Sequence, residues 1–221
     1  MKRYAIILPM LITSTFAATA APSIPDEMLV GAEADNHTIA VTDPEYEWSQ
    51  TDTKKAKVEF KAQSLALESK DDKGMAYSVV ELPINVENNA EFAFGLNLNG
   101  PKLEDSKNFG MLFDYQDMRN YKCLQIGKKQ FAYIVVKDGI ESIVKTGPVK
   151  HKGSSFSLVA KRENGGLEFF LNGLQVCRLR KITLSSSYCG VCVCGKAKAE
   201  LRSFMMYVPA QDDTEQSTTD M

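Results

Sequence analysis

The short stretch from Tyr115 to Tyr121 holds side chains suited to binding a ring-shaped, polyhydroxylated ligand. A phenol stands at each end, and Asp117, Arg119 and Asn120 between them supply charged and hydrogen-bonding groups. A phenol offers a flat apolar ring for stacking and a hydroxyl for hydrogen bonding. A bland turn needs the Asp and the Asn, but it does not need the Arg or two flanking tyrosines. We therefore treat these five residues as candidate ligand-binding residues.

Two further aromatic residues, Phe131 and Tyr133, stand in the next apolar run and also suit stacking on a sugar ring. We add Tyr133 to the candidate site because its phenol supplies a hydroxyl as well as a ring. Packing in a hydrophobic core explains such aromatic residues equally well, so both interpretations remain open.

Asp114, Asp117 and Asn120 are spaced three apart and offer the oxygen ligands that calcium takes. The alternative is that they form a turn by accepting hydrogen bonds from backbone N–H groups. We favour the turn and predict no bound metal.

The sequence lacks the residue patterns of the hydrolases we considered. Only Glu33-Ala34-Asp35 begins like the Glu-x-Asp-x-x-Glu of a retaining glucanase, and Thr38 stands where the second Glu is needed. The two histidines, His37 and His151, both lie in polar contexts with no neighbouring pattern of a serine hydrolase or zinc peptidase. We predict no catalytic residue and no cofactor.

The five cysteines are candidate structural residues rather than metal ligands. On a strand, Cys192 and Cys194 would share a face while Cys189 lies on the opposite face, which does not suit the compact ligand set of structural zinc. Small buried thiols are the favoured interpretation. The pairing of Cys123, Cys177 and these three cannot be deduced.

Three apolar runs position the candidate residues. Residues 109–115, 121–126 and 131–136 are rich in aromatic and branched side chains, and the breaks at 116–120 and 127–130 carry turn-forming Asp, Asn and Gly. Parallel strands need crossovers of about a dozen residues or more, so these runs form an antiparallel meander.

Similar short runs continue to both sides, with hairpin turns at Asp138-Gly139 and Asn172-Gly173. In Glu91–Asn97, Phe92, Phe94 and Leu96 alternate with smaller or polar residues, as in a strand with one buried face. Many short strands with regular turns predict an all-β fold, an antiparallel β-sandwich.

The first residues have the pattern of a secretory signal peptide. Lys2 and Arg3 precede an apolar core at Ala5–Ile12, and Ala18-Thr19-Ala20 forms a small-residue cleavage site. We predict cleavage after Ala20 and export to the periplasm, the cell surface or the extracellular space.

The rest of the chain divides into a leader, a domain and a tail. Residues 21–44 form the leader, which is expected to lay a short strand, Thr38–Val41, on the domain edge. Residues 45–208 form the domain, and the polar, acidic residues 209–221 form a tail expected to be disordered. The apolar core of the signal peptide is too short to span a membrane, and the rest of the chain has no candidate membrane segment.

Composition excludes some partners. The formal net charge is −2, and lysines and arginines are spread along the chain without a basic stripe. Neither nucleic acid nor an anionic membrane surface is favoured electrostatically.

The motif pattern resembles the concanavalin A-like lectin/glucanase superfamily. The resemblance lies in Asn108–Asp114, Asn120-Tyr121, Leu167–Gly173, Tyr188–Lys196 and Leu201–Tyr207. It is nearest to laminin-G-like and 3-keto-disaccharide hydrolase-like domains of exported proteins from Bacteroides-type bacteria. The resemblance implies a jelly roll of two curved sheets, often with sugar bound on the concave side.

Three functions are compatible with the resemblance. The leading expectation is a non-catalytic module that binds glycans, with the loop from Tyr115 to Tyr121 bordering a shallow site on the concave sheet. A glycoside hydrolase or lyase would instead require two close acidic residues with perturbed pKa values. A structural or protein-binding domain requires neither feature.

Overall fold

The computed structural model describes residues 34–39, 46–51, 53–83, 86, 91–100, 103, 108–151 and 153–209. The predicted signal peptide, most of the leader and the tail from residue 210 lie outside these ranges. The described residues form strands, turns and irregular segments, so the all-β prediction is confirmed. They include no helix with the length and hydropathy of a bilayer-spanning segment.

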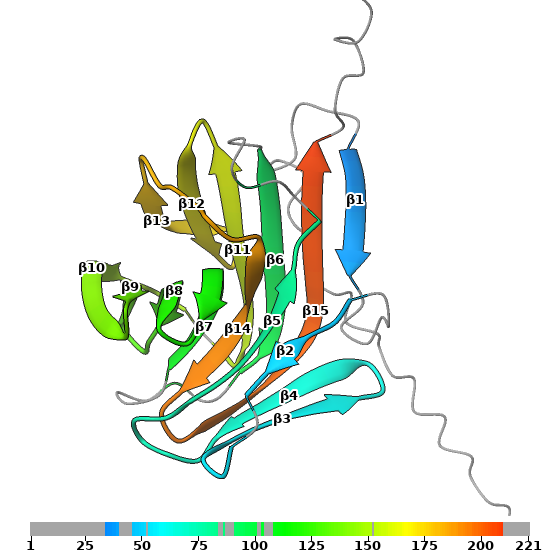
Figure 1. Cartoon of the computed structure of the whole chain (residues 1–221), viewed down its shortest axis with the longest axis vertical. Helices are drawn as coiled ribbons and strands as arrows, with labels where there is room; N and C mark the ends of the chain where they lie inside the picture. The colour runs from blue at the N-terminus through cyan, green and yellow to red at the C-terminus, as the bar shows by residue number, and fades with distance from the viewer. Residues whose placement is uncertain are drawn as a thin grey trace, which may run out of the picture.

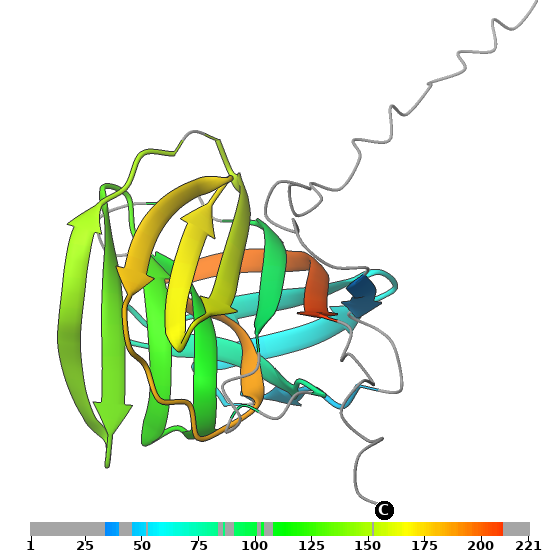
Figure 2. The same cartoon turned by 90° about the horizontal axis from the view of Figure 1, so that it is seen from above.

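The strands form two antiparallel sheets that pack face to face (Figures 1 and 2). Sheet A has the spatial order β13 (Leu174–Leu179), β12 (Gly166–Leu171), β11 (Ser155–Glu163), β6 (Phe92–Asn99), β15 (Ala197–Pro209), β4 (Ser64–Ser69) and β3 (Ala56–Lys61), and β1 (Ala34–Ile39) also pairs with β15. Sheet B has the order β10 (Ile140–Pro148), β9 (Gln130–Lys137), β8 (Asn120–Ile126), β7 (Asn108–Asp117), β14 (Tyr188–Cys194), β5 (Met75–Glu81) and β2 (Ser49–Gln50).

The predicted meander is observed as β7, β8 and β9, with β10 continuing it to the edge of sheet B (Figure 1). The predicted leader strand overlaps β1 at Thr38 and Ile39, and β1 begins earlier, at Ala34.

The hairpin turns follow from residues that tolerate positive φ. Asp138 and Gly139 have φ of 54° and 81°, and Asn172 and Gly173 have φ of 50° and 79°, as type I′ turns require. Asn164-Gly165 forms a further turn of this kind between β11 and β12, which the sequence analysis did not single out.

The hydrophobic core lies between the two sheets. Strict alternation buries Phe92, Phe94, Leu96 and Leu98 of β6 against the inner side chains of sheet B, including Phe113 of β7. The opposite sides of the two sheets are therefore the outer faces of the sandwich, and any surface site must lie on an outer face, at an edge or in the loops.

Candidate functional site

The structure distributes the predicted site residues over three places. Asp117, Arg119 and Asn120 form the tip of the β7–β8 hairpin. Tyr115 and Tyr121 lie on the outer face of sheet B, where they pack over a small apolar cluster. Tyr133 lies on the inner face of the same sheet. The structure therefore brings together only part of the predicted set.

The tip residues bond mainly to each other and to the neighbouring turn. One oxygen of the Asp117 carboxylate accepts the Arg119 N–H at 2.6 Å and the Asn120 side-chain amide at 3.2 Å. The Arg119 guanidinium donates to the Asp138 backbone carbonyl at 3.2 Å. The side-chain oxygen of Asn120 accepts the Asp138 backbone N–H at 3.1 Å. These bonds agree with the turn interpretation and connect the β7–β8 hairpin to the β9–β10 turn.

Asp114 does not join Asp117 in a calcium site. It is 8% exposed and has a φ of 50°. Its carboxylate accepts the N–H groups of Ser185 and Ser186 at 2.6 and 2.8 Å and the Lys122 ammonium at 2.5 Å. Within the described ranges, no group of three or more acidic, His or Cys side chains is arranged to hold a metal ion.

The place of Tyr133 corrects its inclusion in the candidate site. It is 5% exposed, and its ring stacks on Phe113 with centroids 6.1 Å apart. Burial raises the pKa of the Tyr133 phenol to about 12. The side chain belongs to the core, the alternative that the sequence left open.

Four tyrosines gather on the outer face of sheet B, and we call this surface the tyrosine face. Tyr115 and Tyr121 have ring centroids 6.4 Å apart, and Tyr77 of β5 lies 5.6 Å from Tyr115. The Tyr115 hydroxyl lies 3.2 Å from the Tyr77 hydroxyl, and Tyr188 of β14 packs against the same cluster. The sequence analysis missed Tyr77 and Tyr188. These residues lie on β5 and β14, which are distant from β7 in the chain and lie beside it only because of the sheet order β7-β14-β5.

The tyrosines cover a second, smaller apolar layer. Val79, Leu112, Cys123 and Cys192 point outward from sheet B yet are 0% exposed. The thiols of Cys123 and Cys192 meet 3.7 Å apart across β7, above Gly110. The predicted alternation is observed, since Cys192 and Cys194 belong to this outer layer while Cys189 faces the main core.

The phenols of Tyr115 and Tyr121 remain protonated at neutral pH. Burial raises the pKa of the Tyr115 phenol, and the hydrogen bond with Tyr77 raises it further. Burial also raises the pKa of the Tyr121 phenol. The Glu81 carboxylate accepts the Tyr188 hydroxyl at 3.0 Å. Farther along the same outer face, the Asn108 side-chain amide donates to the Gln125 side-chain oxygen at 3.5 Å. The face thus combines flat rings, neutral donors and amide groups.

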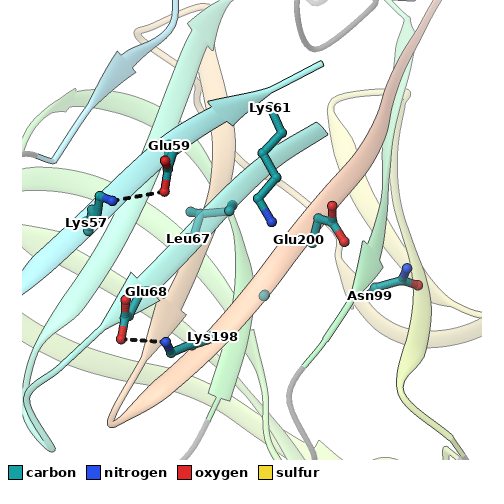
Figure 3. A pocket seen from close by; sticks show the side chains of 10 residues that line it. Lys57, Glu59, Lys61, Leu67, Glu68, Asn99, Lys198 and Glu200 are labelled. Carbon is teal, nitrogen blue, oxygen red and sulfur yellow. Dashed lines mark hydrogen bonds and ion pairs between the residues drawn. The ribbon is translucent and has the colours of Figure 1, made fainter. Parts of the chain in front are cut away.

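A groove of about 330 Å³ lies on the other side of the sandwich, on the outer face of sheet A (Figure 3). Its lining comes from β3, β4, β15 and the end of β6: Lys57, Glu59, Lys61, Ala66, Leu67, Glu68, Asn99, Lys198, Ala199 and Glu200. Two ion pairs lie in its lining, Lys57–Glu59 along β3 and Lys198–Glu68 between β15 and β4, both at 2.9 Å. Sequence analysis missed this groove because β15 and β6 are distant in the chain from the β3–β4 hairpin.

Glu59 and Glu68 of this groove are poor candidates for a glycosidase acid. Hydrogen bonding to Lys57 lowers the pKa of Glu59, and hydrogen bonding to Lys198 lowers the pKa of Glu68. A general acid in glycoside hydrolysis requires a raised carboxyl pKa. The arrangement favours hydrogen bonding and charge pairing over proton transfer.

Comparison with known proteins identifies the fold. No protein-family model and no curated protein sequence matches the chain. Among solved structures, the carbohydrate-binding module CBM66 from Bacillus subtilis matches with a TM-score of 0.55 and 10% identity, covering 72% of this chain and 94% of that one. The Emp47p carbohydrate recognition domain matches with a TM-score of 0.56 and 8% identity over 78% and 94% of the two chains. A Bacillus subtilis protein of unknown function with a galectin-like fold gives 0.53 and 12% over 79% and 96%.

These similarities establish a galectin-like, jelly-roll β-sandwich and thus confirm the predicted fold class. They agree with the jelly-roll fold that the resemblance to the concanavalin A-like superfamily implies. The narrower resemblance to laminin-G-like or 3-keto-disaccharide hydrolase-like domains of Bacteroides-type bacteria remains a prediction. At such low identity, the shared property is the fold.

Proposed function

We propose that this chain is an exported, non-catalytic module that binds glycans through the tyrosine face of sheet B. The observation that carries the proposal is the cluster of Tyr77, Tyr115, Tyr121 and Tyr188 on one outer face of a sandwich whose fold resembles carbohydrate-binding domains. The hairpin tip with Asp117, Arg119 and Asn120 borders this face, so it is proposed as the rim.

The chemistry of the face suits a neutral sugar ring. The axial C–H groups of a pyranose pack on aromatic faces, and hydroxyls exchange hydrogen bonds with neutral phenols and amides. Glu81 pairs in register with Tyr188, and Glu141 lies in the same register row as Tyr121, so the charges of these carboxylates disfavour an acidic sugar on this face. The preferred ligand is therefore a neutral saccharide.

The shallow form of the face implies weak binding. The apolar layer beneath the tyrosines is closed, so a ligand stacks on the rings without being enclosed. A millimolar Kd corresponds to about 4 kcal/mol of binding free energy, which is the scale expected for such a surface.

The test is a titration of the mature domain with a panel of neutral oligosaccharides, followed by NMR shifts of backbone amides. We expect shifts on β7, β8, β14 and β5, and loss of binding in Tyr121→Ala. Tyr207→Ala is the matched control because Tyr207 lies on the outer face of sheet A. Arg119→Ala measures the contribution of the rim.

Three results would contradict the proposal. Shifts confined to sheet A would place the site elsewhere, and unchanged binding in Tyr121→Ala would remove the role of the tyrosines. Release of shorter sugars during the titration would identify a hydrolase instead.

Export is tested separately. N-terminal sequencing of the native protein is expected to show a chain that begins at Ala21 and is recovered outside the cytoplasm. An intact Met1 would contradict this part of the proposal.

A further inference from the structure

The groove of sheet A is built from charged rows across three strands. Register places Lys57, Glu68 and Lys198 side by side, and Glu59 and Glu200 on either side of Ala66. Because Ala66 is small, the centre of the second row is a hollow floored by a methyl group and flanked by carboxylates. This arrangement gives the groove its depth.

Most charges of the groove already have a partner. Lys57 pairs with Glu59 and Lys198 with Glu68, while the Glu200 carboxylate accepts the Ser64 hydroxyl at 2.6 Å and lies 2.8 Å from the Arg202 guanidinium. The ammonium partners of Glu59 and Glu68 favour the ionised form of these two carboxylates, which accept hydrogen bonds, and Glu200 already accepts one from Ser64.

Lys61 differs from the other charged residues of the lining. It ends β3, and its side chain extends over the groove toward Glu200 (Figure 3). Among the described residues, it forms no ion pair within 4.0 Å. The Lys61 ammonium can therefore pair with an anionic group of a ligand, and the neighbouring carboxylates can accept hydrogen bonds from ligand hydroxyls.

We propose that this groove is a second binding site, chemically distinct from the tyrosine face, for a saccharide that carries a carboxylate, such as a hexuronate. The carboxylate pairs with Lys61, and the ring hydroxyls donate to the free lone pairs of Glu59 and Glu200, with the Asn99 amide at the far wall.

The size and charge of the groove both limit the ligand. A volume of about 330 Å³ lies at the small end of the range for ligand sites, about 300–1,000 Å³, and so suits a short saccharide. The carboxylates repel a polyanion such as a nucleic acid or a highly sulfated chain. A saccharide with one carboxylate and several hydroxyls matches a groove with the Lys61 ammonium and several hydrogen-bond acceptors.

The two sites differ in chemistry and face opposite directions. The tyrosine face has rings and acidic ends and suits a neutral sugar, whereas the groove of sheet A has a free cation and suits an acidic sugar. The two proposals can fail independently, because each site has its own strands, variants and ligands.

The experiment titrates the mature domain with the methyl glycoside of galacturonic acid, which carries one carboxylate, and, in parallel, with its methyl ester, which lacks the charge. Backbone amide shifts locate the binding. We expect shifts on β3, β4 and the first half of β15 with the acid, and much smaller shifts with the ester. Lys61→Gln is expected to weaken binding about fivefold, as is typical for loss of an exposed ion pair.

Lys137→Gln is the matched control, since it makes the same charge change at an exposed position at the end of β9 in sheet B. It should bind the acid like the wild type, as should Tyr121→Ala. Raising the salt concentration should weaken binding, because screening acts on exposed charges.

Several outcomes would overturn the proposal. These are an absence of shifts on sheet A, equal binding of acid and ester, and unchanged binding in Lys61→Gln. Shifts of the acid on the tyrosine face would assign the acidic sugar there instead. Loss of neutral-sugar binding alone would affect the proposed function and leave the groove unaffected.

Discussion

Replacing Phe113 with Ala tests how the two sheets are held together. Phe113 lies in β7 and is 2% exposed. Its ring lies 5.3 Å from Phe169 of sheet A and 6.1 Å from Tyr133 of sheet B, so it contacts both layers. Truncation to a methyl group removes these contacts and leaves a cavity between the sheets.

The expected loss of unfolding free energy is about 4 kcal/mol. Emptying a buried Phe site costs about 3–5 kcal/mol, depending on how far the surroundings collapse. Collapse is limited here because the neighbouring rings belong to hydrogen-bonded strands in both sheets. For a urea m-value of about 2 kcal/mol/M, this loss lowers the unfolding midpoint by about 2 M.

The assay is urea unfolding followed by the fluorescence of Trp48, the single tryptophan of the chain. Its ring packs edge-on against Phe204, with centroids 5.5 Å apart, so its emission reports the loss of tertiary structure. Phe60→Ala is the control, because Phe60 is 44% exposed and its truncation should change the free energy by less than about 1 kcal/mol. A change below about 1 kcal/mol for Phe113→Ala would refute the reasoning, since Phe113 would then not be a core residue.

Three other predictions concern sheet B and the buried thiols. Gly190→Ala places a Cβ 2.0 Å from the Ser78 carbonyl oxygen, so β14 and β5 must separate. Thermal unfolding should show a loss of unfolding free energy of at least about 1–3 kcal/mol. An unchanged Tm would contradict the close approach of the two strands. Because burial raises the pKa of Tyr133 from 10.0 to about 12, the stability that this phenol contributes is fully present below pH 10 and is lost as the pH rises toward 12. In urea titrations, Tyr133→Phe should lose less stability than the wild type as the pH rises from 10 toward 12. An identical pH dependence would show that ionisation of the Tyr133 phenol does not cause the loss. Burial also raises the pKa of Cys189 well above its ordinary value, so thiol reagents should label it slowly in the native protein and rapidly in urea; rapid native labelling would contradict its burial.

Local sequence determined the meander and its turns. Apolar runs rich in aromatic and branched side chains, separated by turn-forming residues, identified the meander strands because such side chains suit a pleated, buried surface. Asp138-Gly139 and Asn172-Gly173 identified two hairpins because few other residues adopt the required positive φ. These features depend on residues close together in the chain, so a single sequence reveals them.

Only part of the tyrosine face was predictable from the sequence. Tyr115 and Tyr121 were recognised from their position beside one hairpin, but strict alternation from Phe113 places Tyr115 on the inner face of the sheet. The positive φ of Asp114 and the irregular register that follows Phe113 accompany its move to the outer face. The bonds of Asp114 to Ser185 and Ser186 stabilise this irregularity, and no local pattern indicates them.

Tertiary structure alone decided which distant strands became neighbours. The sequence contained Tyr77 and Tyr188 in plain strand patterns, but only the insertion of β14 between β7 and β5 brings them to Tyr115. The groove arises in the same way, since the pairing of β4 with β3 and β15 brings Lys61 and Glu200 to one surface. Periodicity specifies which side of a strand is buried, but pairing between distant strands is selected by the fit of the whole core. The composition of each outer face is therefore a property of the folded chain.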